Sequence, residues 1–245
     1  MKTLIVVAHA DDETIAASRW MAMAPQQFTI LHTTDSGPRN PKYFQRAGFA
    51  SSDAYAMYRR TELLAAMKFV EIDESQCHMS QVPDQEAIMN VPLLSKNIAS
   101  FFPVDRIITH SYEGGHPDHD ATALAVALAV GCSGLEVLEF PAYHAAVDGT
   151  LVASQFLPHP THPLIQRIPL DPADAARKAS MFDCFRSQQH LFSRFSTTEE
   201  LFRRAPEYDF LAPPHAGTLY YETRDMGMHY EMWRQFAQAV LSSKK

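Results

Sequence analysis

The 245-residue chain contains few cysteines, few glycines and no long apolar run. Cys77, Cys132 and Cys184 are widely spaced, so they suit neither a disulfide framework nor a zinc–thiolate knuckle, and such a set is typical of a reducing compartment. No stretch reaches the ~18 apolar residues of a transmembrane helix. Asp11 and Asp12 interrupt the first apolar run too early for a signal peptide. We therefore expect a cytoplasmic protein without a membrane span.

Basic residues are also scarce. The 21 Lys and Arg residues are outnumbered by 28 Asp and Glu, which gives a net charge of −7, and no dense basic cluster is present. This balance argues against a nucleic-acid partner. The hydrophobic share of 46% is ordinary for a globular protein, and the length fits one α/β domain. The sequence is compatible with a homo-oligomer but does not determine the oligomeric state.

Predicted strands and helices alternate through about residue 140. The predicted strands are 3–8, 28–34, 68–72, 106–110 and 135–140. The predicted helices are 12–23, 52–67, 84–102 and 121–130, with Pro92 starting a new helix inside the third and an irregular loop at 38–52. This alternation predicts a Rossmann-like α/β fold, in which helices cover both faces of a mostly parallel sheet.

The pattern changes after residue 140, where prolines become frequent. Strands at 151–157 and 164–168 predict an antiparallel hairpin, and a helix is expected at 171–187 with Pro172 in its first turn. A further helix is expected to start at 197–200, followed by a strand at 219–222 and a helix at 230–241. We interpret 1–245 as a single domain, with an α/β core at 1–140 and a hairpin and helix elaboration on the substrate side at 141–245.

The strand at 3–8 ends abruptly in His9, followed by Asp11, Asp12 and Glu13. Open α/β sheets place their ligand sites at the carboxyl ends of strands. Adjacent buried carboxylates are unfavourable unless a cation or hydrogen bonds compensate them. A histidine with carboxylates is a mixed nitrogen and oxygen set that suits zinc. The competing interpretation is that these residues only cap the following helix and bind no metal.

A second polar cluster, His116, Asp118 and His119, follows the strand at 106–110. Both clusters should meet at the same edge of a parallel sheet. Three protein ligands and one water make an open catalytic zinc site, and we predict His9, Asp12 and His119 as the ligands. Asp11 is left as a carboxylate beside the metal. Iron or cobalt would also suit this set, so the metal is not fixed.

The motif His9-Ala10-Asp11-Asp12-Glu13 resembles the His-Pro-Asp-Asp-Glu motif of the PIG-L/LmbE-like zinc de-N-acetylases, with alanine in place of the usual proline. The segment 116–119 is similar to the second motif of that family. The helix segment 59–62 and the later 178–188 segment resemble two more of its features. The resemblance implies hydrolysis of an N-acetyl group on an amino sugar, and it implies that Arg59 binds sugar hydroxyls or a substrate acid.

The expected chemistry assigns one role to each catalytic residue. Asp11 would act as general base for the water, a contribution of roughly 10²–10⁴-fold. His116 would be protonated, stabilise the oxyanion and then protonate the leaving amine. Asp118 would hold His116 charged, because a nearby carboxylate raises the pKa of an imidazole. Glu13 would cap the helix or orient a ligand.

Two other functions compete with an amino-sugar or glycoconjugate deacetylase. One is a metal-dependent amidohydrolase acting on a non-sugar N-acyl substrate. The other is a nucleotide-binding module, which is disfavoured because no Gly-x-Gly-x-x-Gly follows the first strand and the loop there is acidic. Specificity should lie in 38–58 and 141–220. We expect the remaining histidines, including His110, to serve packing or the surface, while Tyr143 and His144 follow a strand and could line a pocket.

Overall fold

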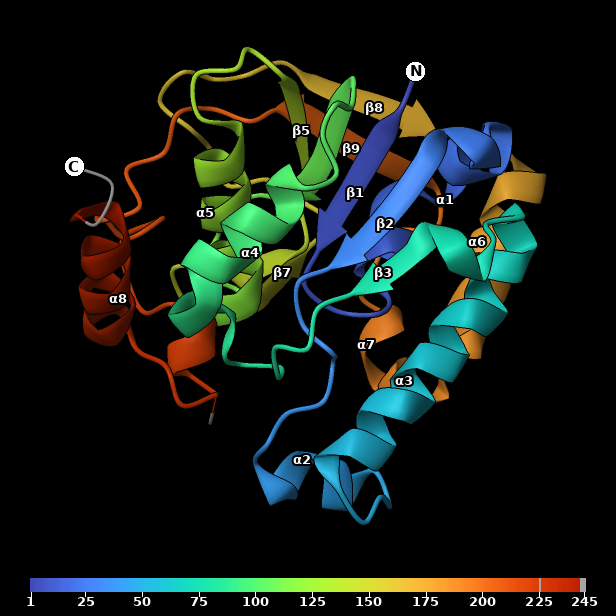
Figure 1. Cartoon of the computed structure of the whole chain (residues 1–245), viewed down its shortest axis with the longest axis horizontal. Coiled ribbons are helices and arrows are strands. Elements are labelled where there is room, and N and C mark those ends of the chain that lie inside the picture. Colours follow the sequence, from blue (N-terminus) through green and yellow to red (C-terminus); the bar gives the residue numbers. More distant parts are fainter. Residues whose placement is uncertain (225, 243–245) are drawn as a thin grey trace.

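The computed structural model describes residues 1–224 and 226–242, and within them seven strands form one sheet in the order β3-β2-β1-β4-β5-β9-β8 (Figure 1). These strands are β1 (Thr3–Val7), β2 (Phe28–His32), β3 (Cys77–Met79), β4 (Arg106–His110), β5 (Glu136–Phe140), β8 (Ile165–Pro169) and β9 (Glu199–Arg204). Strands β1 to β5 are parallel, β9 runs antiparallel to β5, and β8 runs antiparallel to β9. The predicted Rossmann-like, mostly parallel α/β sheet is confirmed.

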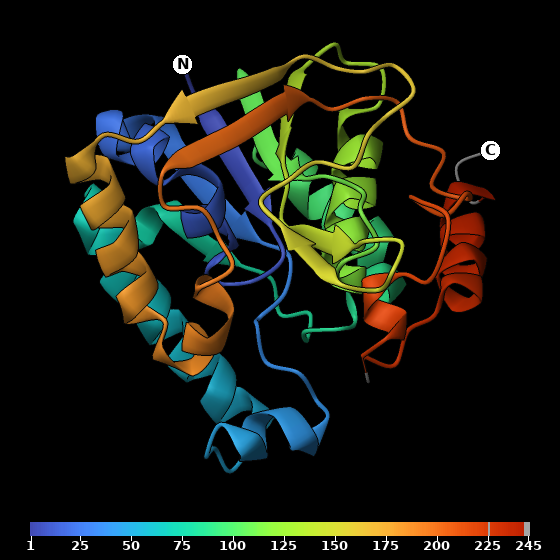
Figure 2. The ribbon, with the colours of Figure 1, turned by 180° about the vertical axis from the view of Figure 1, so that it is seen from behind.

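Helices cover both faces of this sheet, as Figures 1 and 2 show from opposite sides. The six main helices are α1 (Asp12–Met23), α3 (Ser52–Met67), α6 (Pro172–Cys184), α4 (Val91–Ala99), α5 (Pro117–Val130) and α8 (Tyr230–Ser242). The first three pack on one face and the last three on the other. Alternate β1 residues enter the two layers, since Ile5 joins one hydrophobic cluster and Leu4 the other. This two-sided burial explains the unbroken apolar run.

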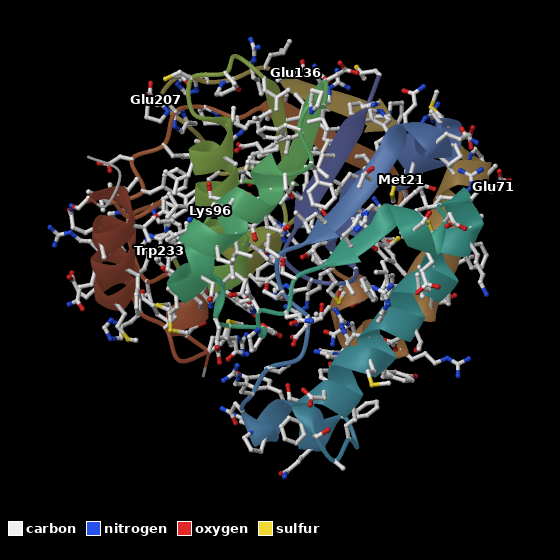
Figure 3. The ribbon with its side chains drawn as sticks, in the orientation of Figure 1. Met21, Glu71, Lys96, Glu136, Glu207 and Trp233 are labelled. Carbon is white, nitrogen blue, oxygen red and sulfur yellow. The ribbon has the colours of Figure 1, made fainter. Side chains whose placement is uncertain are left out.

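Shorter elements connect these layers. They are α2 (Pro41–Arg46), α7 (Gln189–Phe192), the hairpin strands β6 (Tyr143–Ala145) and β7 (Leu151–Ala153), and the 3-10 helices Pro25–Gln27, Lys68–Val70, Glu74–Gln76, Ala87–Asn90, Arg186–Gln188 and Tyr220–Glu222. Side chains fill the space between the layers (Figure 3), and Trp233 of α8 is fully buried against the α4–α5 layer. The predicted irregular loop at 38–52 contains α2.

Several local predictions are wrong. The strands expected at 68–72 and 219–222 are 3-10 helices. The expected hairpin between 151–157 and 164–168 does not form, because β7 pairs with β6 and β8 pairs with β9. The helix expected to start at 197–200 is instead strand β9. Pairing with strands distant in sequence therefore overrides local preference in this half of the chain.

Two buried ion pairs hold β9 in the sheet. Glu200 of β9 lies 3.4 Å from the amino group of Lys178 and accepts a hydrogen bond from the Ser18 hydroxyl at 2.7 Å. Arg203 donates to Glu139 of β5 at 2.6 Å. All four charged side chains are almost completely buried. Residues after 140 thus complete the sheet as well as elaborate it. Among the described residues, no helix is long and apolar enough to cross a membrane.

Candidate metal and catalytic site

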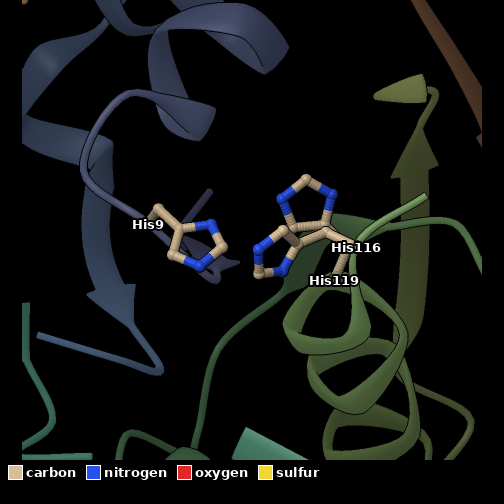
Figure 4. Close-up of side chains that lie close together, drawn as sticks. All are labelled: His9, His116 and His119. Carbon is tan, nitrogen blue, oxygen red and sulfur yellow. The ribbon is translucent and has the colours of Figure 1, made fainter. Parts of the chain in front are cut away.

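Three imidazoles meet at the carboxyl edge of the sheet. His9 follows β1, while His116 caps the N-terminus of α5 and His119 lies in its first turn. Figure 4 shows His9 facing the other two rings from the opposite side of a gap. The ring centroids lie 4.6 Å apart for His9 and His116, 5.3 Å for His9 and His119, and 5.2 Å for His116 and His119. β1 and β4 are parallel neighbours, and this pairing brings the two motifs together.

Asp12 lies between two of these rings. Its carboxylate is 3.5 Å from the Nδ1 atom of His9 and 3.5 Å from the Nε2 atom of His119, and it accepts the backbone N–H of His9 at 2.8 Å. Burial opposes its negative charge, but the imidazoles of His119 and His110 hold the pKa of Asp12 well below its usual range. Asp12 therefore contacts both of the other residues predicted as ligands, and the role of all three in metal binding stays a prediction.

His110, which the sequence analysis assigned to packing or surface roles, is a buried neighbour of this cluster. Its ring stacks on His119 with centroids 3.9 Å apart, and its Nε2 atom accepts the backbone N–H of Ala8 at 3.0 Å. That atom also lies 3.3 Å from the Asp12 carboxylate. His110 ends β4, beside β1, and this strand-end position is the signal that could have found it.

Asp84 is a second residue that sequence reasoning missed. Its carboxylate lies 3.2 Å from Nε2 of His9 and 3.7 Å from Nε2 of His116. Burial works against its charge, yet His9 and then His116 lower the pKa of Asp84 below its usual range. Carboxylates have the opposite effect on His9. Burial lowers the pKa of His9, but Asp84, Asp118 and Asp12 together raise it well above the usual value.

Asp11 has an unusual backbone and a buried cationic partner. Its φ of 147° is a conformation that non-glycine residues rarely adopt. Arg59 lies 3.1 Å from its carboxylate and also donates to the carbonyl of Ala10. Burial raises the pKa of Asp11 to about 7, although Arg59 pulls it down. Arg59 is only 3% exposed and contacts protein groups, and its predicted contact with substrate stays a prediction.

The α5 N-terminus fixes the tautomer of His116. The backbone N–H of Asp118 donates to Nδ1 of His116 at 3.2 Å, so Nε2 carries the proton of the neutral ring. The Asp118 carboxylate is 4.0 Å from that Nδ1 atom, whereas it lies 3.1 Å from Nε2 of His9 and accepts the N–H of Gln85 at 2.6 Å. Burial and His9 lower the pKa of His116. The prediction that Asp118 keeps His116 charged is therefore wrong, and Asp118 instead orients His9 and the loop that carries Asp84.

Glu13 also serves to orient a neighbour. Its carboxylate accepts the backbone N–H of Asp11 at 3.0 Å and lies 3.0 Å from Nε2 of the buried His32. The sequence analysis expected Glu13 to cap the helix or orient a ligand, and these contacts show that it supports the turn instead. Glu13 therefore links β2 to the turn that presents Asp11 and Asp12.

The donor set suits a divalent transition metal. Ligand atoms lie within 4.8 Å of one another in three groups: His9, His116 and His119; His9, Asp84, His116 and Asp118; and Asp12, His110 and His119. Imidazole nitrogen and carboxylate oxygen are ordinary ligands of zinc, and iron or cobalt accepts the same donors. The predicted ligands His9, Asp12 and His119 are divided between these groups and are joined by the 3.5 Å contacts of Asp12.

Residues 4–130, just over half of the chain, match the family described as "PIG-L: GlcNAc-PI de-N-acetylase". The chain belongs to this family. The matched segment contains both histidine motifs and all of the site residues described above. No curated protein compared with the chain matches it. The PIG-L resemblance inferred from the motifs is thereby confirmed.

Solved structures share the fold at low sequence identity. The zinc-inhibited form of teicoplanin deacetylase is 16% identical, with a TM-score of 0.65 over 85% of this chain and 99% of that one. The N,N'-diacetylchitobiose deacetylase from Pyrococcus horikoshii is 15% identical, with a TM-score of 0.52 over 88% and 86%. The 4-carboxy-2-hydroxymuconate hydratase from Pseudomonas putida KT2440 is 16% identical, with a TM-score of 0.50 over 85% and 98%. Because this group includes a hydratase, the reaction must be argued from the site.

Proposed function

We propose that this PIG-L family chain is a zinc-dependent N-deacetylase that hydrolyses the N-acetyl group of an amino sugar or of an amino-sugar conjugate. The observation that carries the proposal is the contact of Asp12 with both His9 and His119, in a cluster that also contains Asp11, held by Arg59, and His116, the cap of α5. Family membership supports it, and two of the structurally similar proteins are named as deacetylases. The hydratase neighbour acts on a different bond, so the fold adds no support for the reaction.

His9, Asp12 and His119 would hold the metal ion. When bound, Zn²⁺ lowers the pKa of water to about 7 and polarises a carbonyl group. The remaining residues of the cluster orient these ligands: Asp118 lies against His9, and His110 stacks on His119. Such outer contacts fix ring orientation and make the imidazoles better ligands.

The chain itself supplies a base and an acid. The carboxylate of Asp11 would accept a proton from the water that attacks the acetyl carbon. His116 would donate a hydrogen bond from Nε2 to the oxyanion that forms, and Asp11 would deliver the proton it has accepted to the nitrogen as the C–N bond breaks, which leaves acetate and a free amine. Arg59 keeps Asp11 in place and stabilises its charge. The Asp118 amide donates to Nδ1 of His116, so the proton of the neutral ring is on Nε2, the atom that lies 3.7 Å from Asp84.

Acetate release by the purified, zinc-loaded protein tests the proposal. N-acetylglucosamine and its conjugates are compared with N-acyl amino acids at equal concentration. The proposal expects acetate from the sugars and none above background from the amino acid derivatives. Release from the amino acid derivatives alone would favour the non-sugar amidohydrolase, and no release from either set would overturn deacetylation. Elemental analysis of the same preparation identifies the metal.

A further inference from the structure

The two ring nitrogens of His9 face different groups of ligand atoms. Nδ1 lies 3.5 Å from the carboxylate of Asp12, which also contacts His119. Nε2 lies 3.2 Å from the carboxylate of Asp84 and 3.1 Å from that of Asp118. His9 therefore separates the proposed catalytic metal site from a second group of carboxylates.

His116 completes this second group. Its Nε2 atom lies 3.7 Å from the Asp84 carboxylate, and the ligand atoms of His9, Asp84, His116 and Asp118 all lie within 4.8 Å of one another. His116 faces His9 across the gap in Figure 4. Ligand atoms on a tetrahedral zinc ion, each about 2.1 Å from the metal, are about 3.4 Å apart. The distance between Asp84 and His116 is close to that value.

The charges of the second group match those of a divalent cation. Asp84 and Asp118 supply two carboxylates, and their side chains are 17% and 0% exposed. Within residues 1–224 and 226–242, the ion-pair partners of these carboxylates are His9 and His116 alone, and no lysine or arginine neutralises them. Carboxylate oxygen with imidazole nitrogen is an ordinary donor set for zinc, iron or cobalt.

Backbone hydrogen bonds already hold the carboxylates in place. Asp118 accepts the N–H of Gln85 at 2.6 Å and the N–H of Ala87 at 3.0 Å, one through each oxygen. Gln85 directly follows Asp84, so one turn fixes the positions of both carboxylates. Because a carboxylate has about four lone-pair sites, Asp118 can keep these two bonds and still bind a cation.

The tautomer of His116 makes this group weaker than the first. Its Nδ1 atom accepts the N–H of Asp118 at 3.2 Å, so the proton of the neutral ring is on Nε2. A metal ion at Nε2 moves that proton to Nδ1 and leaves the Asp118 amide without its acceptor. We therefore expect the second group to fill only after the first.

We propose that Asp84, His116 and Asp118 form a second, weaker site for a divalent transition metal ion, and that an ion bound there inhibits turnover. The inhibition rests on the proposed deacetylase function, because the ion takes Nε2 of His116 away from the oxyanion. Binding of the second ion does not depend on that function. Loss of one oxyanion donor typically lowers kcat by about 10²–10³-fold.

Zinc titration tests the site without turnover. Protein that contains one equivalent of zinc is titrated calorimetrically with further Zn²⁺. We expect the wild type to bind one further equivalent, and Asp84→Asn and His116→Asn to bind none while elemental analysis still finds the first. Asparagine at position 116 keeps a helix-capping acceptor. Asp53→Asn is the matched control, because Asp53 is an exposed aspartate in the first turn of α3 and belongs to none of the three groups of ligand atoms.

Acetate release with one and with two equivalents of zinc tests the inhibition. The kcat of the wild type and of Asp53→Asn should fall by about 10²–10³-fold when the second site is saturated. The activity that Asp84→Asn retains should not change with added zinc. Equal inhibition of all these proteins would overturn the inhibitory role of the site.

The titration also separates this proposal from the deacetylase function. A further equivalent of zinc that is lost in Asp84→Asn and His116→Asn supports the second site even if no protein releases acetate, an outcome that overturns only the deacetylase function. No further equivalent in the wild type, or the same further equivalent in both variants, would overturn the second site and leave Asp84 and Asp118 with the orientation of His9 as their role.

Discussion

The guanidinium group of Arg59 lies 3.1 Å from the carboxylate of Asp11, and both side chains are buried. The same guanidinium donates to the carbonyl of Ala10, so α3 holds the turn that carries Asp11 and Asp12 through two neighbouring residues. This matters because the φ of Asp11 is strained and needs surrounding contacts to persist. Arg59 therefore positions the turn, whether or not it also contacts substrate.

Arg59→Ala should remove both stability and activity. Breaking a buried ion pair leaves the Asp11 carboxylate uncompensated, at a cost of about 3–5 kcal/mol in the free energy of unfolding. Arg59→Lys should restore part of both, since lysine returns the charge without the forked contact. Chemical denaturation and acetate release measure the two effects. An increase in KM alone, with unchanged stability, would instead assign Arg59 only to substrate binding.

Asp11→Asn should abolish turnover while zinc remains bound. The amide has nearly the shape of the carboxylate but cannot accept the proton, so kcat should fall by roughly 10²–10⁴-fold. Acetate release and metal content are measured on the same sample. Full activity in this variant would remove Asp11 from the role of general base.

His119→Ala should lose the metal ion. The variant removes one imidazole from the proposed ligands and leaves His110 without its stacking partner. His190→Ala is the control, because His190 is an exposed histidine outside the cluster. Elemental analysis after dialysis should find stoichiometric metal in the control only. Stoichiometric metal in His119→Ala would show that other residues bind it.

Gly115→Ala should disturb the site through the β6–β7 hairpin. A Cβ atom at this position would overlap the carbonyl oxygen of Tyr143, and the Tyr143 ring packs edge-on against His119 with centroids 5.4 Å apart. The hairpin or the His116 segment must therefore move, at a cost of about 1–3 kcal/mol. We expect lower stability together with lower kcat. Wild-type values of both would show that the contact relaxes without consequence.

Glu113 should make stability depend on pH. Burial raises its pKa from 4.5 to about 8, so the folded protein binds more protons than the unfolded chain between these values. The contribution of Glu113 to the free energy of unfolding is fully present below pH 4.5 and is lost as pH rises through 8. Asp120 and Glu139, both with pKa values raised by burial to about 7, add to the same trend.

Glu113→Gln isolates this contribution. A glutamine can accept the Ala142 N–H and donate to the Ser111 hydroxyl, the two groups that now contact the carboxylate. Its unfolding free energy should therefore decline less between pH 5 and pH 9 than that of the wild type, with a difference of about 1 kcal/mol or more. Denaturant titrations at these two pH values measure the difference, and parallel declines would contradict the assignment.

The sheet and the meeting of the two motifs could be predicted because both depend on local signals. An unbroken apolar run such as 3–8 predicts a buried strand, and parallel strands present their carboxyl ends at one edge. The sequence therefore predicts that His9 and His119 lie close together although they are far apart along the chain. The helices that begin at Asp12, Ser52 and Pro172 carried equally local capping and proline signals.

Contacts that form only through tertiary structure could not be predicted from such local signals. Asp84 was expected to begin a helix over 84–102, but the helical residues begin only at Ala87, and the contact of Asp84 with His9 depends on where β3 ends beside β2. Strand β9 contains Glu, Leu and Arg, which favour helix, but its buried Glu200 and Arg203 form ion pairs with Lys178 and Glu139 from distant elements. In both cases the decisive partner is far away in sequence.

The place of β9 between β5 and β8 has a consequence for biosynthesis. A nascent chain that has emerged only as far as β5 presents that strand with an open edge, and open edges invite pairing with other chains. Closure must wait until Glu199–Arg204 leaves the ribosome, some sixty residues later. Maturation of the half that contains the candidate site is therefore tied to the final third of translation, and truncations near residue 140 should aggregate rather than yield a smaller folded protein.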